Sequence, residues 1–307
     1  MSITKEAKIY IAGHNGMVGS ACWRVLEARG YKNLIGLSSK ELDLREQQAV
    51  YDFIEREKPD AIIDAAAKVG GILANSSFPY AFLMDNMLIQ NNLIKAAHEL
   101  DIQKFIFLGS SCIYPKLAPQ PLKEEFLLTG PLEASNEWYA IAKISGVKLI
   151  EAIRKQYHRD YMSLMPTNLY GPGDNYDLET SHVLPAMIRK FHEAKLSSSK
   201  EVVLWGSGSP RREFLHVDDL ANGVVYALES SLKEPLYNIG SGSEISIKDL
   251  AKLIQGIIGY HGVINWDSSK PDGTPKKLMD SSRFNALGWS AKIDLAKGVS
   301  EVYKLQF

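Results

Sequence analysis

The chain has 307 residues, 45% of them hydrophobic and 23% charged, and its formal net charge is −1. This length and composition fit one large or two modest globular domains, and the charge argues against broad nucleic-acid binding while allowing a local basic pocket. The two cysteines, Cys22 and Cys112, show no metal-ligand spacing and suit a reducing compartment, and no signal core or apolar run of ~18 residues is present, so we expect a cytoplasmic protein without a membrane partner.

Strands and helices alternate through the first half of the chain. The predicted elements, in order, are strand 8–12, helix 17–29, strand 34–37, helix 46–57, strand 61–64, helix 79–100, strand 104–108, helix 136–157 and strand 161–165. This rhythm predicts an α/β protein of the Rossmann type, in which a doubly wound parallel sheet is covered by helices on both faces.

The alternation ends after residue 166, where glycine, proline and asparagine cluster at 168–175. A helix at about 183–195 and a short strand at 201–205 follow. We expect a dinucleotide-binding domain over 1–166, joined by a returning segment at roughly 214–237. The rest of 167–307 is expected to form a smaller α/β substrate domain. The ligand crevice is predicted between the two, at the carboxyl ends of the strands.

A glycine-rich segment between the first strand and the first helix predicts the cofactor site. Gly13, Gly16 and Gly19 let the backbone approach a pyrophosphate, and the N–H groups that begin the helix are free to bind it. The spacing differs from the three-glycine Rossmann fingerprint. The residues expected to contact cofactor here also include Asn15, Met17 and Val18.

The end of the second strand indicates which nicotinamide cofactor is bound. An acidic residue there would hold a free ribose hydroxyl, but this chain has Ser38, Ser39 and Lys40 instead. Two hydroxyls and an ammonium group suit a 2′-phosphate, which favours NADP(H).

Tyr139 and Lys143 lie four residues apart in the predicted helix 136–157, so they share one face, about one turn apart. A positive charge beside a phenol eases loss of its proton, and we expect Lys143 to lower the pKa of Tyr139. Taken alone, the pair is an ordinary pair of surface neighbours. Its context favours a catalytic role, because Ser110 and Cys112 follow the strand 104–108 and offer a hydroxyl and a thiol at the expected crevice.

With these motifs in order, the chain resembles the extended short-chain dehydrogenase/reductase superfamily and, more closely, its GDP-L-fucose synthase family. Nearly the whole chain takes part in the resemblance. The matching segments are Ala66–Gly71, Gly109–Pro115, Asn136–Lys143, Pro166–Pro172, Arg212–Asp219 and Lys270–Pro275. One departure is Asn15, where many bacterial members carry an arginine, and it weakens the case for NADP(H) without removing it.

The resemblance implies an NADP-dependent epimerase and reductase that acts on a GDP-linked 4-keto sugar. It assigns Cys112 and His182 as the acid/base pair for epimerisation at C3 and C5, in an order that the sequence does not fix. Ser110 and Tyr139 would bind O4, and Lys143 the nicotinamide ribose. The cofactor contacts that it adds are Leu108, Pro166, Asn168, Leu169 and His182.

Four residues of the second half follow the family's substrate-binding positions, namely Lys190, Trp205, Arg212 and Asp272. Arg212 can bind a diphosphate with its guanidinium fork. Each also has a plainer interpretation, as a surface cation, a core aromatic or a turn residue. The long apolar helices 79–100 and 136–157 predict a homodimer, since members of this superfamily commonly pair through a four-helix bundle.

Three other interpretations stay open. A 4-epimerase or 4,6-dehydratase on the same scaffold would keep NAD tightly bound and regenerate it in each cycle. A binding protein that senses nicotinamide nucleotides without turnover should lack Tyr139 or Lys143, and this chain has both. A scaffold protein could use the fold for interaction alone, which nothing in the sequence favours.

Overall fold

Six parallel strands form the central sheet of the computed structural model, which describes residues 3–270 and 272–307. Their spatial order is β2-β1-β3-β4-β5-β9, and every neighbouring pair is parallel. The strands are β1 (Lys8–Ala12), β2 (Asn33–Ile35), β3 (Ala61–Asp64), β4 (Lys104–Leu108), β5 (Asp160–Pro166) and β9 (Leu236–Ile239). This sheet, with helices on both faces, confirms the predicted Rossmann-type fold class.

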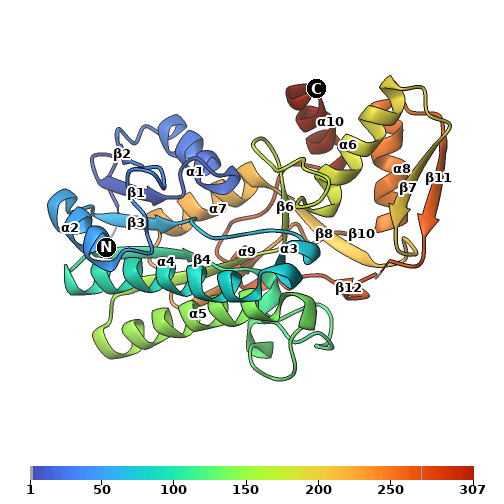
Figure 1. The fold of residues 1–307 in the computed structure, drawn as a ribbon. Helices are drawn as coiled ribbons and strands as arrows, with labels where there is room; N and C mark the ends of the chain where they lie inside the picture. The colour runs from blue at the N-terminus through green and yellow to red at the C-terminus, as the bar shows by residue number, and fades with distance from the viewer. Residues whose placement is uncertain (1–2, 271) are drawn as a thin grey trace.

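The helices cover the two faces because side chains alternate along each strand. Ile9, Ile11 and Ile63 pack with the helices α1 (Met17–Ala28) and α7 (Val217–Glu229). Tyr10, Ile62 and Phe107 face the opposite layer. That layer, seen below the sheet in Figure 1, consists of α2 (Gln47–Glu57), α4 (Pro79–Glu99) and α5 (Glu137–Tyr157).

The second part of the molecule is built from shorter strands and a separate hydrophobic core. One sheet contains β6 (Asn168–Tyr170), β8 (Arg211–His216), β10 (Glu244–Ser246) and β12 (Lys276–Lys277), and a two-stranded sheet pairs β7 (Glu201–Trp205) with β11 (Val263–Asp267). The helices here are α6 (Val183–Leu196), α8 (Ile247–Ile258) and α10 (Leu295–Gln306). They enclose a core that includes Leu184, Phe191 and Leu250.

The chain passes between the two parts several times. β8 belongs to the second part, yet α7 follows it directly and packs on α1, and β9 then joins the edge of the central sheet beside β5. β10 returns to pair with β8. The domain boundaries at 166 and 214–237 remain predictions.

Several short elements were not predicted from the sequence. The helix α3 (Ile72–Ser77) follows the loop 68–71, and 3₁₀ turns occupy Ser111–Ile113, Glu124–Phe126 and Ala134–Asn136. A short helix α9 (Ser282–Asn285) precedes the C-terminal helix. Such short stretches have too few turns to produce a periodic pattern.

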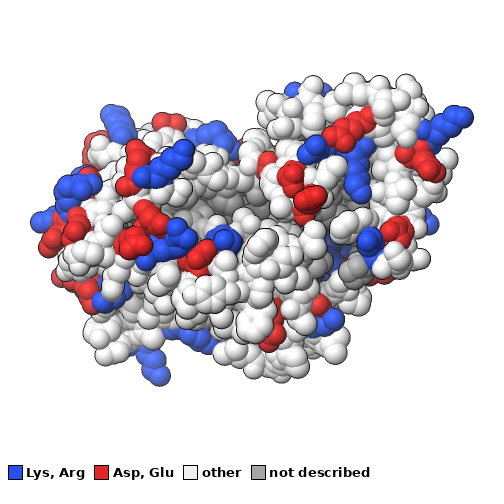
Figure 2. Space-filling view, in the orientation of Figure 1, with Lys and Arg blue, Asp and Glu red and all other residues white. Residues whose placement is uncertain are grey.

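Charged side chains of both signs are intermixed over the face shown in Figure 2, and a hollow lies between the two parts of the molecule. This distribution agrees with the formal net charge of −1. In the described ranges, no helix has the length and apolar character needed to span a bilayer. The cytoplasmic location stays a prediction.

Candidate active site

The glycine-rich segment forms a tight turn between β1 and α1. Gly13 has a φ of +77°, which favours glycine, and a Cβ atom on Gly19 would lie 2.1 Å from the carbonyl oxygen of Gly13. Gly16 is the N-cap of α1, and no side chain caps the first turn. The N–H groups at this helix end are therefore left to bind an anion, so these residues fit the pyrophosphate of a dinucleotide.

The three residues after β2 that are predicted to bind a 2′-phosphate lie at or near the surface. Ser38 donates hydrogen bonds from its backbone N–H (2.8 Å) and its hydroxyl (2.7 Å) to the carboxylate of Glu41. These bonds lower the pKa of Glu41, so a negative charge already stands beside the predicted phosphate site. Asn15 is exposed in the glycine-rich turn. Glu41 was missed by the sequence analysis, although the Ser-x-x-Glu spacing is typical of such a turn.

Ser110 and Cys112 lie just beyond the carboxyl end of β4. The Ser110 hydroxyl accepts a hydrogen bond of 3.4 Å from the backbone N–H of Cys112, and so caps the following 3₁₀ turn. The Cys112 side chain is only 6% exposed. Burial raises the pKa of the Cys112 thiol, while the positive charge of Lys277 and the hydrogen bond with Ser110 oppose that rise.

Tyr139 and Lys143 lie on successive turns of α5, as predicted. The Lys143 ammonium group donates a hydrogen bond of 2.9 Å to the carbonyl oxygen of Leu108 and lies 4.6 Å from the centre of the Phe107 ring. It is 5.9 Å from the centre of the Tyr139 ring. Burial raises the pKa of Tyr139, and Cys112 raises it further. The expected lowering by Lys143 is absent because this ammonium group is directed to β4.

The residues expected at the nicotinamide lie where β5 passes into β6. Pro166 ends β5, and Asn168 and Leu169 belong to β6. The Asn168 side chain donates a hydrogen bond of 2.8 Å to the carbonyl oxygen of Glu213 on β8. This bond fixes the Asn168 amide at the junction between the two parts.

His182 is the N-cap residue of α6 and is exposed. The segment before it is anchored to the other part of the molecule, since the Gly71 N–H donates to the Thr180 carbonyl oxygen at 3.1 Å. A Cβ atom on Gly71 would lie 3.0 Å from the Ser181 carbonyl oxygen, so this approach is close. The surrounding protein and the charge of Lys277 lower the pKa of His182, which favours a neutral imidazole.

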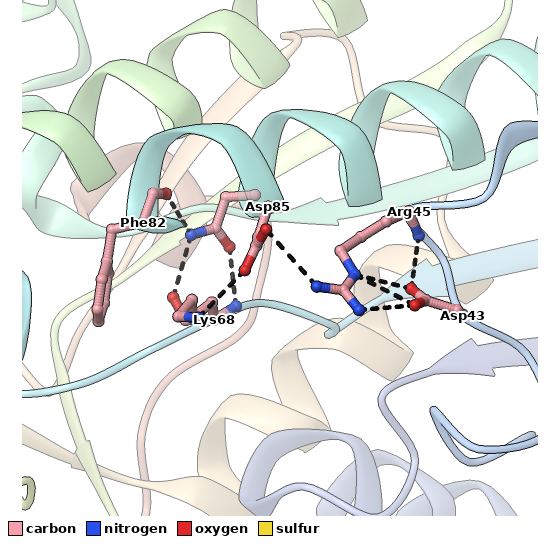
Figure 3. Close-up of polar contacts among 6 residues, drawn as sticks. Asp43, Arg45, Lys68, Phe82 and Asp85 are labelled. Atoms are coloured by element: carbon pink, nitrogen blue, oxygen red, sulfur yellow. Dashed lines mark hydrogen bonds and ion pairs between the residues drawn. The ribbon is translucent and has the colours of Figure 1, made fainter. Parts of the chain in front are cut away.

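A polar clamp on α4 holds the loop 65–71 that carries Gly71 (Figure 3). The Asn86 side chain accepts a hydrogen bond from the Lys68 N–H (2.9 Å) and donates to the carbonyl oxygens of Lys68 (3.1 Å) and Phe82 (2.7 Å). Asp85 adds ion pairs with Lys68 at 3.1 Å and Arg45 at 3.7 Å. The Phe82 ring also meets Tyr139 edge-on, so the clamp touches the site directly.

The four predicted substrate residues gather in the second part. The Trp205 ring is 55% exposed, and the Lys190 ammonium group lies 5.9 Å from its centre. Asp272 accepts hydrogen bonds from the Ser207 N–H and hydroxyl at 2.7 and 2.8 Å, which holds it close to the end of β7. Asp272 also interacts electrostatically with Arg212. Pro271, part of the Lys270–Pro275 motif, lies outside the described residues.

Lys277 is a residue of the site that the sequence analysis missed. It lies opposite Arg212 in the parallel pair β12–β8 and lines a narrow cavity together with Cys112 and Asn136. Its charge acts on Cys112, His182 and Arg212. Within the described chain its ammonium group makes no hydrogen bond or ion pair, so this group is left for a ligand or for the thiol. It thus lies between the predicted acid/base pair, Cys112 and His182, and the predicted diphosphate ligand Arg212.

Residues 9–240 match the model of the NAD dependent epimerase/dehydratase family. The chain belongs to that family. Among its relatives, GDP-L-fucose synthase 1 from Arabidopsis thaliana is 54% identical over 299 residues, with 97% of this chain and 93% of the relative covered. GDP-L-fucose synthase from Escherichia coli (strain K12) is 50% identical, with 97% and 96% covered.

A solved structure shares the fold of this chain. The GDP-L-fucose synthetase from Naegleria fowleri bound to NADP superimposes with a TM-score of 0.90 at 28% identity, covering 99% of this chain and 95% of that one. The resemblance inferred from the motifs is therefore confirmed, as is a nicotinamide cofactor. The individual site residues stay predictions.

Proposed function

We propose that this chain converts GDP-4-keto-6-deoxy-D-mannose to GDP-L-fucose, by epimerisation at C3 and C5 followed by NADPH-dependent reduction at C4. The proposal rests on sequence identity. Over nearly its full length, this chain is identical at about half of its positions to relatives named GDP-L-fucose synthase. A thiol beside the Ser110, Tyr139 and Lys143 constellation supports the epimerase half of the reaction, because a reductase alone has no need of it.

Epimerisation begins with the acidity that the C4 ketone gives to the hydrogens on C3 and C5. Cys112 and His182 remove a proton on one face and return one on the other, with the order at each carbon left open. The negative charge that develops on O4 is stabilised by hydrogen bonds from Ser110 and Tyr139. Lys277, which acts electrostatically on both Cys112 and His182, supports the ionised thiol.

Reduction uses the same oxygen. Reduced nicotinamide, when bound, supplies the hydride that reduces C4. Tyr139 gives its proton to O4 as the alcohol forms, so one oxygen site serves both steps. Lys143 binds the ribose hydroxyls. To do so, its ammonium group gives up the hydrogen bond that it donates to the Leu108 carbonyl oxygen in this structure.

The cofactor is proposed to be NADP(H) rather than NAD(H). Ser39 and Lys40 remain available for a 2′-phosphate, and the solved relative from Naegleria fowleri binds NADP. Glu41 and the missing arginine at position 15 oppose this preference. Steady-state assays with each cofactor decide it, and a higher kcat/KM with NADH would contradict the assignment.

The test of the function is direct. The protein is incubated with NADPH and GDP-4-keto-6-deoxy-D-mannose, NADPH oxidation is followed, and the nucleotide sugar is identified by NMR. We expect one NADPH consumed for each GDP-L-fucose formed. A product reduced at C4 without inversion at C3 and C5 would contradict the epimerase half, and turnover without net NADPH consumption would favour a 4-epimerase or dehydratase.

We also propose a homodimer that pairs α4 and α5 of two copies. Tyr80, Met84 and Leu88 are spaced by four residues on α4 and are 74%, 38% and 37% exposed. Trp138 and Ile141 of α5 add exposed apolar area. Light scattering at micromolar concentration should give twice the chain mass, and a Met84→Glu/Leu88→Glu variant should give a monomer. A wild-type monomer would contradict the proposal.

A further inference from the structure

Asp64 is a carboxylic acid with no exposure to solvent at the carboxyl end of β3. One of its oxygens accepts a hydrogen bond of 3.2 Å from the backbone N–H of Ala66. The other oxygen is buried and has no hydrogen-bond partner among the described residues. A buried carboxylate is costly unless an opposite charge compensates it, so this group requires an explanation.

The sheet register shows where the Asp64 side chain lies. Asp64 is opposite Phe107 on the neighbouring parallel strand, and side chains at paired positions of parallel strands share a face. Asp64 therefore faces the layer of α4 and α5, as Phe107 does. The Lys143 ammonium group lies over the Phe107 ring and is bonded to the Leu108 carbonyl oxygen, so it stands against the strand next to Asp64.

The titratable groups that interact electrostatically with Asp64 come from two elements. β1 presents Tyr10, and α5 presents Tyr139 and Lys143. Lys143 is the only cation among them. Lys143 is itself 3% exposed, so burial lowers its pKa, and Asp64 is the foremost group that raises it again. Each buried charge thus offsets the other.

We propose that Asp64 is a positioning residue, whose carboxylate keeps the ammonium group of Lys143 charged and in place to bind the ribose of the cofactor. This inference rests on the proposed function, in which Lys143 binds the ribose hydroxyls. Asp64 does not touch substrate or cofactor, and it acts through Lys143 alone. Tyr139 keeps its proton in this arrangement, because burial raises its pKa and the charges of Cys112 and Asp64 raise it further.

The test measures the Lys143 pKa in the free protein. Lysine labelled with ¹³C at Cε is titrated by NMR, and the Lys143 signal is assigned with Lys143→Met. Asp64→Asn removes the charge and keeps the shape, and we expect it to lower the Lys143 pKa by about one unit. Tyr10→Phe, which changes another neighbour of Asp64 without altering charge, is the matched control and should leave the Lys143 pKa unchanged.

A second readout follows NADPH binding by fluorescence. The dissociation constant of Asp64→Asn should match that of wild type at acidic pH, and it should begin to rise at a lower pH than in wild type, because Lys143 loses its proton sooner without the carboxylate. An unchanged Lys143 pKa in Asp64→Asn overturns the proposal. These measurements need no turnover, so they are independent of whether the GDP-sugar assay succeeds.

If Asp64→Asn does not fold, the reciprocal experiment remains. The Asp64 carboxyl is titrated by NMR in wild type and in Lys143→Met, and linkage requires its pKa to rise when the cation is removed. An Asp64 pKa that does not respond to Lys143→Met overturns the proposal equally.

Discussion

The thiol of Cys112 distinguishes this site from one that only reduces ketones. Cys112→Ser replaces it with a hydroxyl that does not ionise near neutral pH, so we expect exchange of the C3 and C5 hydrogens with deuterated water to fall at least ~100-fold. Mass spectrometry of the recovered nucleotide sugar measures this exchange. NADPH affinity should stay unchanged, because Cys112 lies outside the glycine-rich turn. Exchange at the wild-type rate would show that another group is the base.

Lys277 acts on the thiol through its charge. Lys277→Met should raise the Cys112 pKa by about one unit and slow alkylation by iodoacetamide at pH 8 by roughly tenfold. The alkylation rate of the free protein as a function of pH gives this pKa directly. Cys22 does not interfere, since burial raises its pKa to about 12.

The neighbouring lysine supplies the control for that experiment. Lys276 lines the same cavity, but its ammonium group is paired with Glu244 at 3.0 Å and does not act on the Cys112 thiol. Lys276→Met should leave the alkylation profile of Cys112 in place. Equal effects of the two variants would mean that net charge, rather than position, sets the thiol pKa.

Among single residues, the sequence allowed prediction of the site residues that lie on, or directly after, a helix or strand with a regular pattern of apolar residues. Tyr139 and Lys143 belong to a long helix, and Ser110 and Cys112 follow a buried strand. Lys277 was not found because its strand has two residues and exists only through pairing with β8. The direction of the Tyr139 pKa was wrong because burial is a property of the packed molecule.

At the scale of elements, α4 anchors a loop that joins the two parts of the molecule. Asn86→Ala removes all three hydrogen bonds of its amide and leaves the Lys68 backbone unpaired, so we expect a loss of about 1–3 kcal/mol in the free energy of unfolding. Urea unfolding measures this loss. NADPH or substrate binding should weaken as well, since the clamp contacts Tyr139 through Phe82.

Asn91, on the same helix, offers a matched control. It is only partly buried and makes no hydrogen bond with its side chain in the described part of the chain. Asn91→Ala should change stability by less than about 0.5 kcal/mol. A loss as large as that of Asn86→Ala would contradict the role of the clamp, because helix propensity favours alanine over asparagine and cannot account for a loss.

The long periodic elements were predictable, and the second sheet was not. The five strands predicted before residue 166 lie within about two residues of their predicted bounds, because apolar runs between turn residues are strong local signals. The sheet of β6, β8, β10 and β12 joins residues that are far apart in the sequence. Its strands are too short to show a clear alternation of apolar and polar residues, so only their pairing defines them.

At the scale of the whole molecule, the buried Asp64 makes stability depend on pH. Burial raises its pKa to about 6 from a usual value of 3.8, so the unfolded chain releases this proton first as pH rises. The contribution of Asp64 to stability is therefore lost between about pH 4 and pH 6, and it amounts to about 3 kcal/mol. Asp64→Asn should match wild type near pH 4 and be more stable at pH 7.

Denaturant unfolding of the free protein at several pH values checks this prediction. A less stable Asp64→Asn at pH 7 would contradict the sign. If Asp64→Asn is more stable than wild type and also binds NADPH more weakly at high pH, then the Asp64 carboxylate lowers stability while it supports the function of Lys143.

The repeated passage of the chain between its two parts limits how the protein can be divided. A fragment that stops at residue 166 lacks both α7 and β9, so it would expose the edge of β5 and the apolar surface of α1. Transplanting a new sugar specificity from a homologue therefore requires exchange of at least two separate stretches, on either side of 217–239, while that segment is retained. Recombination libraries for this scaffold should place their crossovers accordingly.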